Sequence, residues 1–219
     1  GAAQAKIRLS GVTRSFGGVR ALDTVDLTLN QRQSLVLIGG SGSGKSLLLK
    51  CILGLVAPEA GTIMVDGVST IGMSDTARMA WMKHFGVLFQ RQGLFDSMLI
   101  WENVAFRLNH EGDLSRAEAR DRAIERLGQV GLLPETADLY PSEVSGGMQK
   151  RVGLARAIAT DPDILFLDEP TAGLDPIMST IISELINERV DELGATVISV
   201  VSDLAVVRNI ADRVVMLHE

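Results

Sequence analysis

Eight residues from Gly39 to Ser46 carry the clearest chemical signal in the sequence. They read Gly39-Gly40-Ser41-Gly42-Ser43-Gly44-Lys45-Ser46 and fit the pattern G-x-x-x-x-G-K-[ST]. Glycines let the backbone turn its N–H groups toward phosphate, and the N-terminus of a following helix adds partial positive charge. In such a loop Lys45 reaches the β- and γ-phosphates and the Ser46 hydroxyl ligates Mg²⁺. The pattern therefore predicts a nucleotide site rather than a flexible Gly/Ser turn.

Two adjacent carboxylates follow the strongly apolar run Ile164–Leu167. In α/β proteins, groups that bind ligands gather at the carboxyl ends of parallel strands. Asp168 is placed to hold Mg²⁺, usually through water, and Glu169 to accept a proton from an attacking water. A solvated strand end before the turn at Pro170 is the alternative, and the presence of Lys45 favours the catalytic interpretation.

A second glycine-containing helix start lies at Ser145, Gly146 and Gly147. The apolar residues that follow keep to one helical stripe and are Met148, Val152, Ala155, Ile158 and Ala159. The helix start is a second place where an anion could bind. If it belongs to a helical insertion, one chain cannot easily bring it to the nucleotide held by Lys45.

The elements that must position these residues alternate between strands and helices. Eight runs predict strands, at Lys6–Leu9, Thr24–Leu29, Leu35–Ile38, Thr62–Val65, Gly86–Phe89, Ile164–Leu167, Thr196–Val201 and Arg213–Leu217. Helical patterns lie at Ser43–Leu53, Met148–Ala159 and Ile177–Leu193, and a capping box from Ser115 to Glu118 begins another helix that ends at Gly128 or Gly131. Three of the strand runs are almost continuously apolar, which is typical of parallel strands buried on both faces. The alternation predicts an α/β core, and the lack of such runs between Gln92 and Ser142 predicts a mainly helical insertion over 92–147.

Composition limits the function classes. The chain has 219 residues, enough for one domain, and a net charge of -6, which argues against a protein that coats nucleic acid. Its single cysteine, Cys51, fits a reducing compartment and is expected to be a buried thiol. A reducing compartment makes the cytoplasm the expected location. The longest mainly apolar stretch, Leu47–Ala57, is too short to span a membrane. The last residues, 214–219, lie in or just after a strand-like run, and we expect the natural chain to continue.

Taken together, these motifs resemble those of the ATP-binding cassette (ABC) ATPases from about Ile7 onward. Gly39–Ser46 matches Walker A, Ile164–Glu169 matches Walker B, and Val144–Gln149 is similar to the LSGGQ signature. Gln90 matches the Q-loop glutamine, Ala172–Asp175 the D-loop, and Phe16 the aromatic residue that stacks on adenine. The resemblance implies one ABC ATPase domain over 1–219. Its P-loop core of mainly parallel sheet, with an N-terminal antiparallel part, would span 1–91 and 148–219, and its helical subdomain 92–147.

The resemblance also implies the ligands and the residue roles. ATP would contact Phe16, Gly39–Ser46, Leu47, Gln90, Asp168, Ser145, Gly146, Gly147 and Asp175. Mg²⁺ would be held by Ser46, Gln90 and Asp168, and hydrolysis would depend on Lys45, Gln90, Glu169 and the residue at position 202. Two copies would associate head to tail, so that Ser145–Gly147 of one copy closes over the γ-phosphate held by the other.

Within the family, Phe89–Met98 and Ser145–Ala159 look most like the phospholipid-trafficking ATPases of Mla and Mce type. The resemblance implies an integral-membrane permease as partner, substrate-binding and regulatory subunits as further partners, no nucleic acid, and a place on the cytoplasmic face of the inner or plasma membrane. The surface between Gln90 and Asn103, including Phe95 and Trp101, would receive a permease helix. The alternative is that Phe95 and Trp101 belong to the core.

Two residues depart from the family pattern. Leu47 stands where most members have Thr, which removes one hydrogen bond to the α-phosphate worth roughly 0.5–1.5 kcal/mol. Ser202 stands where members have the switch histidine. Serine is shorter than histidine and cannot become cationic, so we expect ATP binding with slow hydrolysis. Two alternatives stay open: a water or a nearby residue compensates, or the residue at this position was changed by engineering.

Two other function classes stay open. A non-transport ABC protein of DNA repair or translation is one, although such proteins usually carry a coiled coil or two cassettes. A degenerate, regulatory ATP-binding subunit is the other, and Ser202 keeps it open. Co-purification with a membrane partner would separate the first class from a transporter, and phosphate release would separate the second.

Overall fold

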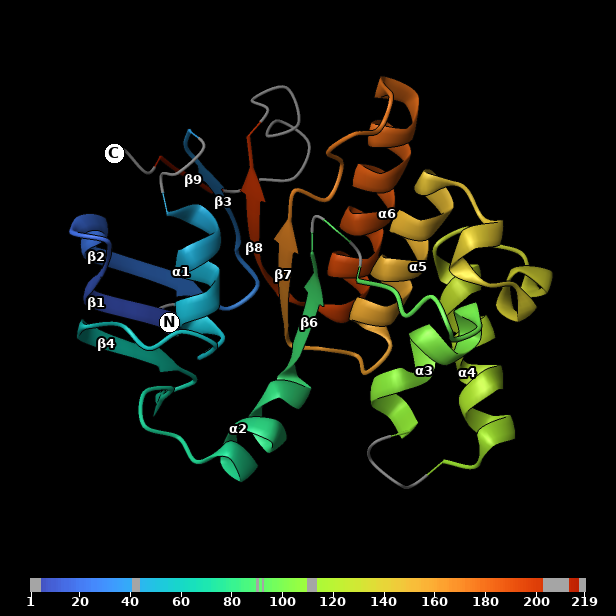
Figure 1. The fold of residues 1–219 in the computed structure, drawn as a ribbon, viewed down its shortest axis with the longest axis horizontal. Coiled ribbons are helices and arrows are strands. Elements are labelled where there is room, and N and C mark those ends of the chain that lie inside the picture. The colour runs from blue at the N-terminus through green and yellow to red at the C-terminus, as the bar shows by residue number, and fades with distance from the viewer. Residues whose placement is uncertain are drawn as a thin grey trace. The chain divides into compact units, whose positions relative to one another are not determined.

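The structure, a computed structural model, describes residues 5–40, 44–89, 91, 93–109, 114–202 and 213–216. The chain divides into two compact units, one of residues 1–83 with 195–219 and one of residues 84–194. Figure 1 shows their elements in the order of the chain.

The first unit contains an antiparallel sheet of order β2-β1-β4-β5. Its strands are β1 (Ala5–Phe16), β2 (Val19–Asn30), β4 (Ala60–Val65) and β5 (Val68–Ser69). Leu9 lies opposite Leu27 of β2 and Ile63 of β4, and all three side chains are buried. The alternation of apolar and polar residues therefore gives this sheet one buried face.

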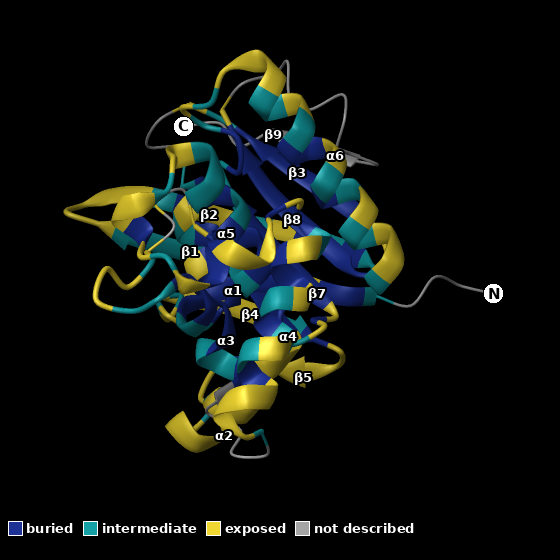
Figure 2. Ribbon diagram, turned by 90° about the vertical axis from the view of Figure 1, so that its right-hand side faces the viewer, coloured by how far each residue is buried: buried dark blue, intermediate teal, exposed yellow. Residues whose placement is uncertain are grey.

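The same unit contains three parallel strands with β3 in the middle. These are β3 (Ser34–Ile38), β8 (Thr196–Val201) and β9 (Arg213–Met216), and β3 pairs with both of the others. Every residue of β3 and β8 is buried, as the continuous dark blue in Figure 2 shows. Helix α1 (Lys45–Ile52) follows β3 and contains the buried Cys51, and α2 (Asp75–Trp81) begins at the cap Ser74.

The second unit combines a parallel strand pair with four helices. Strand β6 (Phe85–Leu88) pairs with β7 (Ile164–Asp168). The helices are α3 (Ile100–Asn109), α4 (Arg116–Gln129), α5 (Gly146–Ile158) and α6 (Pro176–Leu193), and α3, α4 and α5 pack on one another. Short 3₁₀ turns lie at Met82–His84, Pro134–Asp138 and Pro141–Glu143. Strand β6 approaches α5 so closely that a Cβ on Gly86 would lie 2.1 Å from the carbonyl oxygen of Ala157, so glycine is needed there.

The structure confirms the α/β class and the predicted strands and main helices. Most ends are shifted by one to three residues, but β1 runs on to Phe16 instead of ending at Leu9, and β2 begins at Val19 instead of Thr24. The capping box at Ser115 and Glu118 is present and begins α4. Helix α2 and the short strand β5 were not predicted. The assignment of 92–147 to a helical subdomain stays a prediction, and α3 and α4 both lie inside that range. In the part of the chain that the structure describes, none of the helices is both long and apolar enough to cross a membrane.

Candidate nucleotide-binding site

The phosphate loop connects the end of β3 to the start of α1. Gly39 and Gly40 follow the buried strand directly, and Ser41, Gly42 and Ser43 lie outside the described residues. Gly44 has a φ of 86°, and a Cβ there would lie 2.5 Å from the carbonyl oxygen of Ala21. A left-handed backbone and this close approach together require glycine at position 44.

Lys45 lies over the loop with only 9% of its surface exposed. Its ammonium donates hydrogen bonds to the carbonyl oxygens of Gly39 and Gly40, the second at 2.8 Å. The first helical bond of α1 runs from the Leu48 N–H to the Gly44 carbonyl oxygen at 2.8 Å. The N–H groups of residues 45–47 therefore point out of the helix start, beside a held positive charge, which is an arrangement that binds phosphate.

Ser46 and Leu47 differ in exposure at this helix start. Ser46 is exposed, and Leu47 is half-buried. A hydroxyl at position 46 presents a hard oxygen ligand to solvent, which suits Mg²⁺. Leu47 offers no side-chain hydrogen bond to a nucleotide, as its chemistry predicts.

Phe16 ends β1 and is 52% exposed. The guanidinium carbon of Arg14 lies 4.9 Å from the centre of its ring. The chain then turns through Gly17 and Gly18, both with positive φ. The Phe16 ring is exposed and packs against the Arg14 guanidinium, so it is available for stacking on a purine base.

Ser202 lies next to the phosphate loop in the first unit. Strands β3 and β8 are parallel neighbours, and Ile38 pairs with Val201. Gly39 and Ser202 therefore follow the same end of two adjacent strands. Ser202 is exposed, and Asp203 lies outside the described residues.

The acidic pair lies at the end of β7 in the second unit. Asp168 is the last residue of the strand and is half-buried, as is Glu169. Glu169 has a φ of 51°, a left-handed conformation that costs a non-glycine residue on the order of 1–2 kcal/mol. Its carbonyl oxygen accepts a hydrogen bond from the Ala172 N–H at 3.2 Å, which closes the turn after the strand.

Lys150 contacts the turn after β7 that contains Asp168 and Glu169, which we call the acidic turn. The sequence alone assigns no role to Lys150. Its side chain is buried, and its Nζ donates to the carbonyl oxygen of Glu169 at 3.3 Å. Burial lowers the pKa of Lys150, while the charges of Asp168 and Glu169 act to raise it. A signal existed in the sequence, because Lys150 lies four residues before the apolar Leu154 and so shares the inward face of the helix.

The glycine-rich helix start and the D-loop aspartate lie close together in the second unit. Ser145 caps α5, and its Oγ accepts from the Met148 N–H at 3.2 Å. Asp175 caps α6, and its Oδ1 accepts from the Met178 N–H at 3.0 Å. A Cβ on Gly147 would lie 3.0 Å from Cε of Met178, so the first turns of the two helices are in contact. Ser145, Gly146 and Asp175 are all exposed.

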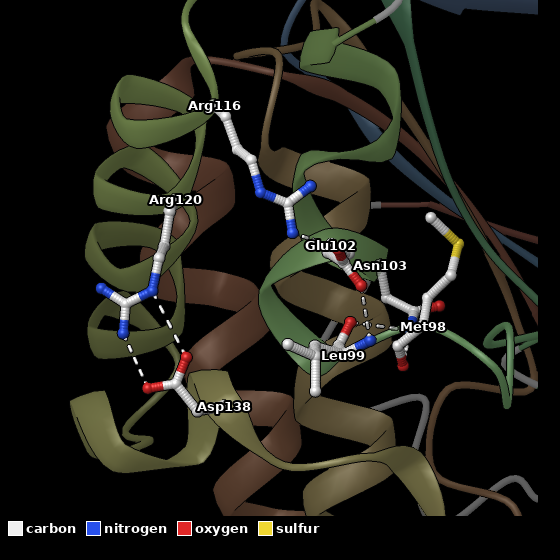
Figure 3. A network of polar contacts seen from close by, with 7 residues as sticks. All are labelled: Met98, Leu99, Glu102, Asn103, Arg116, Arg120 and Asp138. Atoms are coloured by element: carbon white, nitrogen blue, oxygen red, sulfur yellow. Dashed lines mark hydrogen bonds and ion pairs between the residues drawn. The ribbon is translucent and has the colours of Figure 1, made fainter.

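Gln90 lies outside the described residues. In the segment that follows, hydrogen bonds from α3 fix the loop at residues 95–99 (Figure 3). The fully buried Asn103 accepts from the Phe95 N–H at 2.7 Å and donates to the carbonyl oxygens of Met98 and Leu99. Glu102 accepts from the Leu99 N–H at 2.9 Å and pairs with Arg116 at 2.8 Å. The first turn of α3 therefore fixes the shape of the loop from residues 95 to 99.

The two aromatic residues of this segment differ in their surroundings. Trp101 is 2% exposed, with the guanidinium of Arg116 at 4.7 Å from its ring, and belongs to the core. Phe95 is 43% exposed and packs on Phe106 at 4.9 Å between ring centres. Of the two, only Phe95 presents a large surface to a partner.

Comparison with known proteins decides the family. Residues 22–172, more than half of the chain, match the family model described as ABC transporter. The chain belongs to the ABC transporter family. It is 40% identical over 211 residues to the probable ribonucleotide transport ATP-binding protein mkl of Mycobacterium tuberculosis (strain ATCC 25618 / H37Rv), covering 96% of this chain and 58% of that protein. It is 38% identical over 216 residues to the methionine import ATP-binding protein MetN of Rhizobium johnstonii, covering 99% of this chain and 59% of that protein.

Solved structures show the same cassette fold. The dimeric bacterial ABC transporter cassette MJ0796 has a TM-score of 0.89 and 33% identity, covering 97% of this chain and 94% of that chain. The same cassette in a post-hydrolysis state bound to ADP and Pi has a TM-score of 0.88 and 32% identity, covering 96% and 94%. Against the curated relatives, by contrast, this ABC chain spans only about three fifths of their length.

The predicted residues of the ABC site fall into two groups. In the first unit, the structure brings Gly39, Gly40, Gly44, Lys45, Ser46, Leu47 and Ser202 to the ends of β3 and β8, with Phe16 at the end of β1. In the second unit, it holds Asp168 and Glu169 at the end of β7, and Ser145, Gly146, Gly147 and Asp175 at the starts of α5 and α6.

Proposed function

We propose that this chain is the ATP-binding and ATP-hydrolysing motor subunit of a membrane transporter, and that it works as a head-to-tail dimer. The single observation that carries the proposal is the phosphate loop, in which Gly44 fits only as glycine and the buried Lys45 ammonium lies over the loop. Membership of the ABC transporter family supports the same function.

Nucleotide binding is the task of the first unit in this proposal. Lys45 pairs with the β- and γ-phosphates, and the loop N–H groups around Gly39–Ser46 cradle them. Phe16 stacks on adenine with its exposed ring. The absence of a hydroxyl at Leu47 weakens the α-phosphate contact modestly.

Hydrolysis is the task of Glu169, which accepts a proton from the attacking water. The oxygen atoms of Ser46, Gln90 and Asp168 form a donor set that suits Mg²⁺, which supplies charge neutralisation at the β- and γ-phosphates when bound. The turn after β7 holds the Glu169 backbone in a left-handed conformation, which fixes where its side chain begins.

Dimerisation supplies the remaining phosphate contacts. Ser145, Gly146 and Gly147 of a second copy would donate to the γ-phosphate held by Lys45, with Asp175 at the same face. These residues are exposed or half-buried at the first turns of two helices, as an interface requires. The similar cassette MJ0796 has been solved as a dimer.

The transport partner would be an integral-membrane permease, with the chain on the cytoplasmic face of the membrane. The exposed Phe95, on a loop fixed by Asn103, supports a docking role for this segment. Substrate-binding and regulatory subunits complete the proposed complex, and no nucleic acid is part of it.

The cargo we propose is a phospholipid or another hydrophobic molecule, on the resemblance of Phe89–Met98 and Ser145–Ala159 to the Mla and Mce ATPases. Two similar proteins carry names that refer to ribonucleotide transport and methionine import. The complex purified with its own permease would be supplied in turn with phosphatidylethanolamine vesicles, L-methionine and uridine monophosphate. Stimulation of phosphate release by the vesicles alone is expected, and stimulation by either solute instead would replace the lipid assignment.

The motor function is tested by two variants of the purified complex. Lys45→Ala should weaken ATP binding by about 1,000-fold, because truncation removes a buried charged partner worth about 2–5 kcal/mol. Glu169→Gln should bind ATP normally and release phosphate at least about 100-fold more slowly. Lys50→Ala, at an exposed lysine of the same helix α1, is the matched control and should leave both unchanged.

The outcomes separate the alternatives. A parent complex with no ATP-dependent phosphate release, but with tight ATP binding, would support the degenerate regulatory subunit that Ser202 keeps open. Unchanged hydrolysis in Glu169→Gln would contradict the role of that carboxylate.

A further inference from the structure

Lys150 is a buried cation inside the first half of helix α5. Only 4% of its surface is exposed, although burial of an unpaired ammonium is strongly unfavourable. Its Nζ donates to the carbonyl oxygen of Glu169 at 3.3 Å. The helix therefore brings a positive charge to the backbone of the acidic turn.

Glu169 needs such support because its backbone is in a left-handed conformation, with a φ of 51°. Its carbonyl oxygen receives two donors, the Ala172 N–H at 3.2 Å and Lys150 Nζ at 3.3 Å. The Ala172 N–H belongs to the same turn as Glu169, whereas Lys150 lies on helix α5. The backbone dihedrals of a residue set the direction of its Cα–Cβ bond, so these two bonds hold the point from which the Glu169 side chain extends.

We propose that Lys150 is a positioning residue for ATP hydrolysis, which holds the backbone of Glu169 and joins it to helix α5. The inference rests on the proposed role of Glu169 as the group that accepts the proton. Lys150 lies five residues beyond the cap Ser145, about 7.5 Å along a rigid helix. A displacement of the first turn of α5, where the second copy's phosphate is proposed to bind, can therefore reach Glu169 through the Lys150 side chain.

The experiment compares three variants of the transporter complex purified with its permease. Lys150→Met keeps an unbranched side chain that is one atom shorter and removes the donor and the charge. It should lower kcat by about tenfold, the lower end of the effect of losing a supporting contact, with the KM for ATP within about twofold of the parent. Lys150→Arg keeps a charged donor and should recover most of kcat, whereas Lys150→Gln, a neutral donor that is easier to bury, should be intermediate.

Arg151→Met is the matched control on the same helix. Arg151 also donates to a carbonyl oxygen at 3.3 Å, but that of Gly131, away from the acidic turn. Its loss should leave kcat within about twofold of the parent, with any effect confined to the melting temperature. A kcat of Lys150→Met that equals the parent's, or equal losses in Lys150→Met and Lys150→Arg, would overturn the proposal. If Lys150→Met does not fold, a comparison of kcat between Lys150→Gln and Lys150→Arg tests the proposal in its place.

A double-variant cycle separates this inference from the proposed function. In the Glu169→Gln background, Lys150→Met should lower the residual rate by much less than in the parent, because both changes act on one step. Full additivity would show that Lys150 acts independently of Glu169 and would refute the inference alone. Parent-like hydrolysis in Glu169→Gln would remove the proposed role of Glu169 and the inference with it.

Discussion

The ends of strands β3 and β8 lie side by side and differ in how completely they carry the residues of the ABC family. The end of β3 leads into the phosphate loop, where Gly44 and Lys45 are fixed by close contacts and hydrogen bonds. The end of β8 carries Ser202, where the family has a histidine, and this residue is exposed. Strand pairing from Ile38 to Val201 makes the two ends neighbours in one sheet.

The difference predicts that nucleotide binding and nucleotide hydrolysis can be modified separately in this fold. In the proposed site, phosphate is bound by the loop N–H groups, by the start of α1 and by Lys45. All of these lie in the segment that connects β3 to α1. Stabilisation of the charge that develops during hydrolysis needs a further donor from the neighbouring strand end. A replacement at Ser202 can therefore slow the reaction while the phosphate loop stays intact.

Ser202→His is the strongest way to test this contrast. Histidine reaches further than serine and can carry a positive charge beside the γ-phosphate, so kcat should rise by about 100-fold, or ~2.7 kcal/mol. The KM for ATP should change little, because the residues of the phosphate loop are untouched. Steady-state phosphate release by the transporter complex at saturating ATP measures the effect.

Ser202→Asn is the control for this change. Asparagine is longer than serine and can donate a hydrogen bond, but it cannot become cationic. It should give only a small part of the gain. Equal rates for the parent and Ser202→His would mean that another group already does the work of the histidine, and the contrast between the two strand ends would disappear.

Gly44→Ala tests how strongly the phosphate loop at the end of β3 is constrained. Alanine must adopt a φ of 86° and place its Cβ against the carbonyl oxygen of Ala21, at 2.5 Å without rearrangement. The left-handed conformation costs about 1 kcal/mol and the close contact about as much again, so the free energy of unfolding should fall by about 2 kcal/mol. Urea denaturation followed by circular dichroism measures it.

Gly18→Ala separates the two contributions. Gly18 also has a positive φ, of 83°, but no atom lies within 4 Å of the position of its Cβ. This control should lose only the conformational part, about 1 kcal/mol. If both variants lose the same free energy of unfolding, the approach of Ala21 to Gly44 does not constrain the loop.

The elements that the sequence predicted well are those whose burial is expressed in local composition. Strands β3, β7 and β8 are almost continuously apolar, and the structure buries them almost completely. The caps Ser115 and Ser145 also act within one turn of their own helices, so their patterns are local. Helix α2 escaped prediction because it has no buried residue and therefore no apolar stripe.

The acidic turn shows what the sequence could not provide. Asp168 and Glu169 were recognisable as a pair, but the left-handed backbone of Glu169 depends on a turn and on a helix nineteen residues away. The helical spacing of Lys150 is enough to identify it as a buried residue. Its contact with Glu169 cannot be predicted in the same way, because a contact between separate elements depends on how they pack. The roles of the site residues stay predictions for the same reason.

Leu47→Thr is the smallest and most local test of the contrast, because it changes the one residue of the phosphate-binding helix start that departs from the family. A threonine hydroxyl restores one hydrogen bond to the α-phosphate, so ATP should bind about 2- to 10-fold more tightly, or roughly 0.5–1.5 kcal/mol. Leu47→Val has the shape of threonine without the hydroxyl and should not gain affinity. Calorimetric titration with ATP in the Glu169→Gln background, which slows turnover, measures the difference. Equal affinities of the Thr and Val variants would show that the side chain at position 47 does not reach the nucleotide.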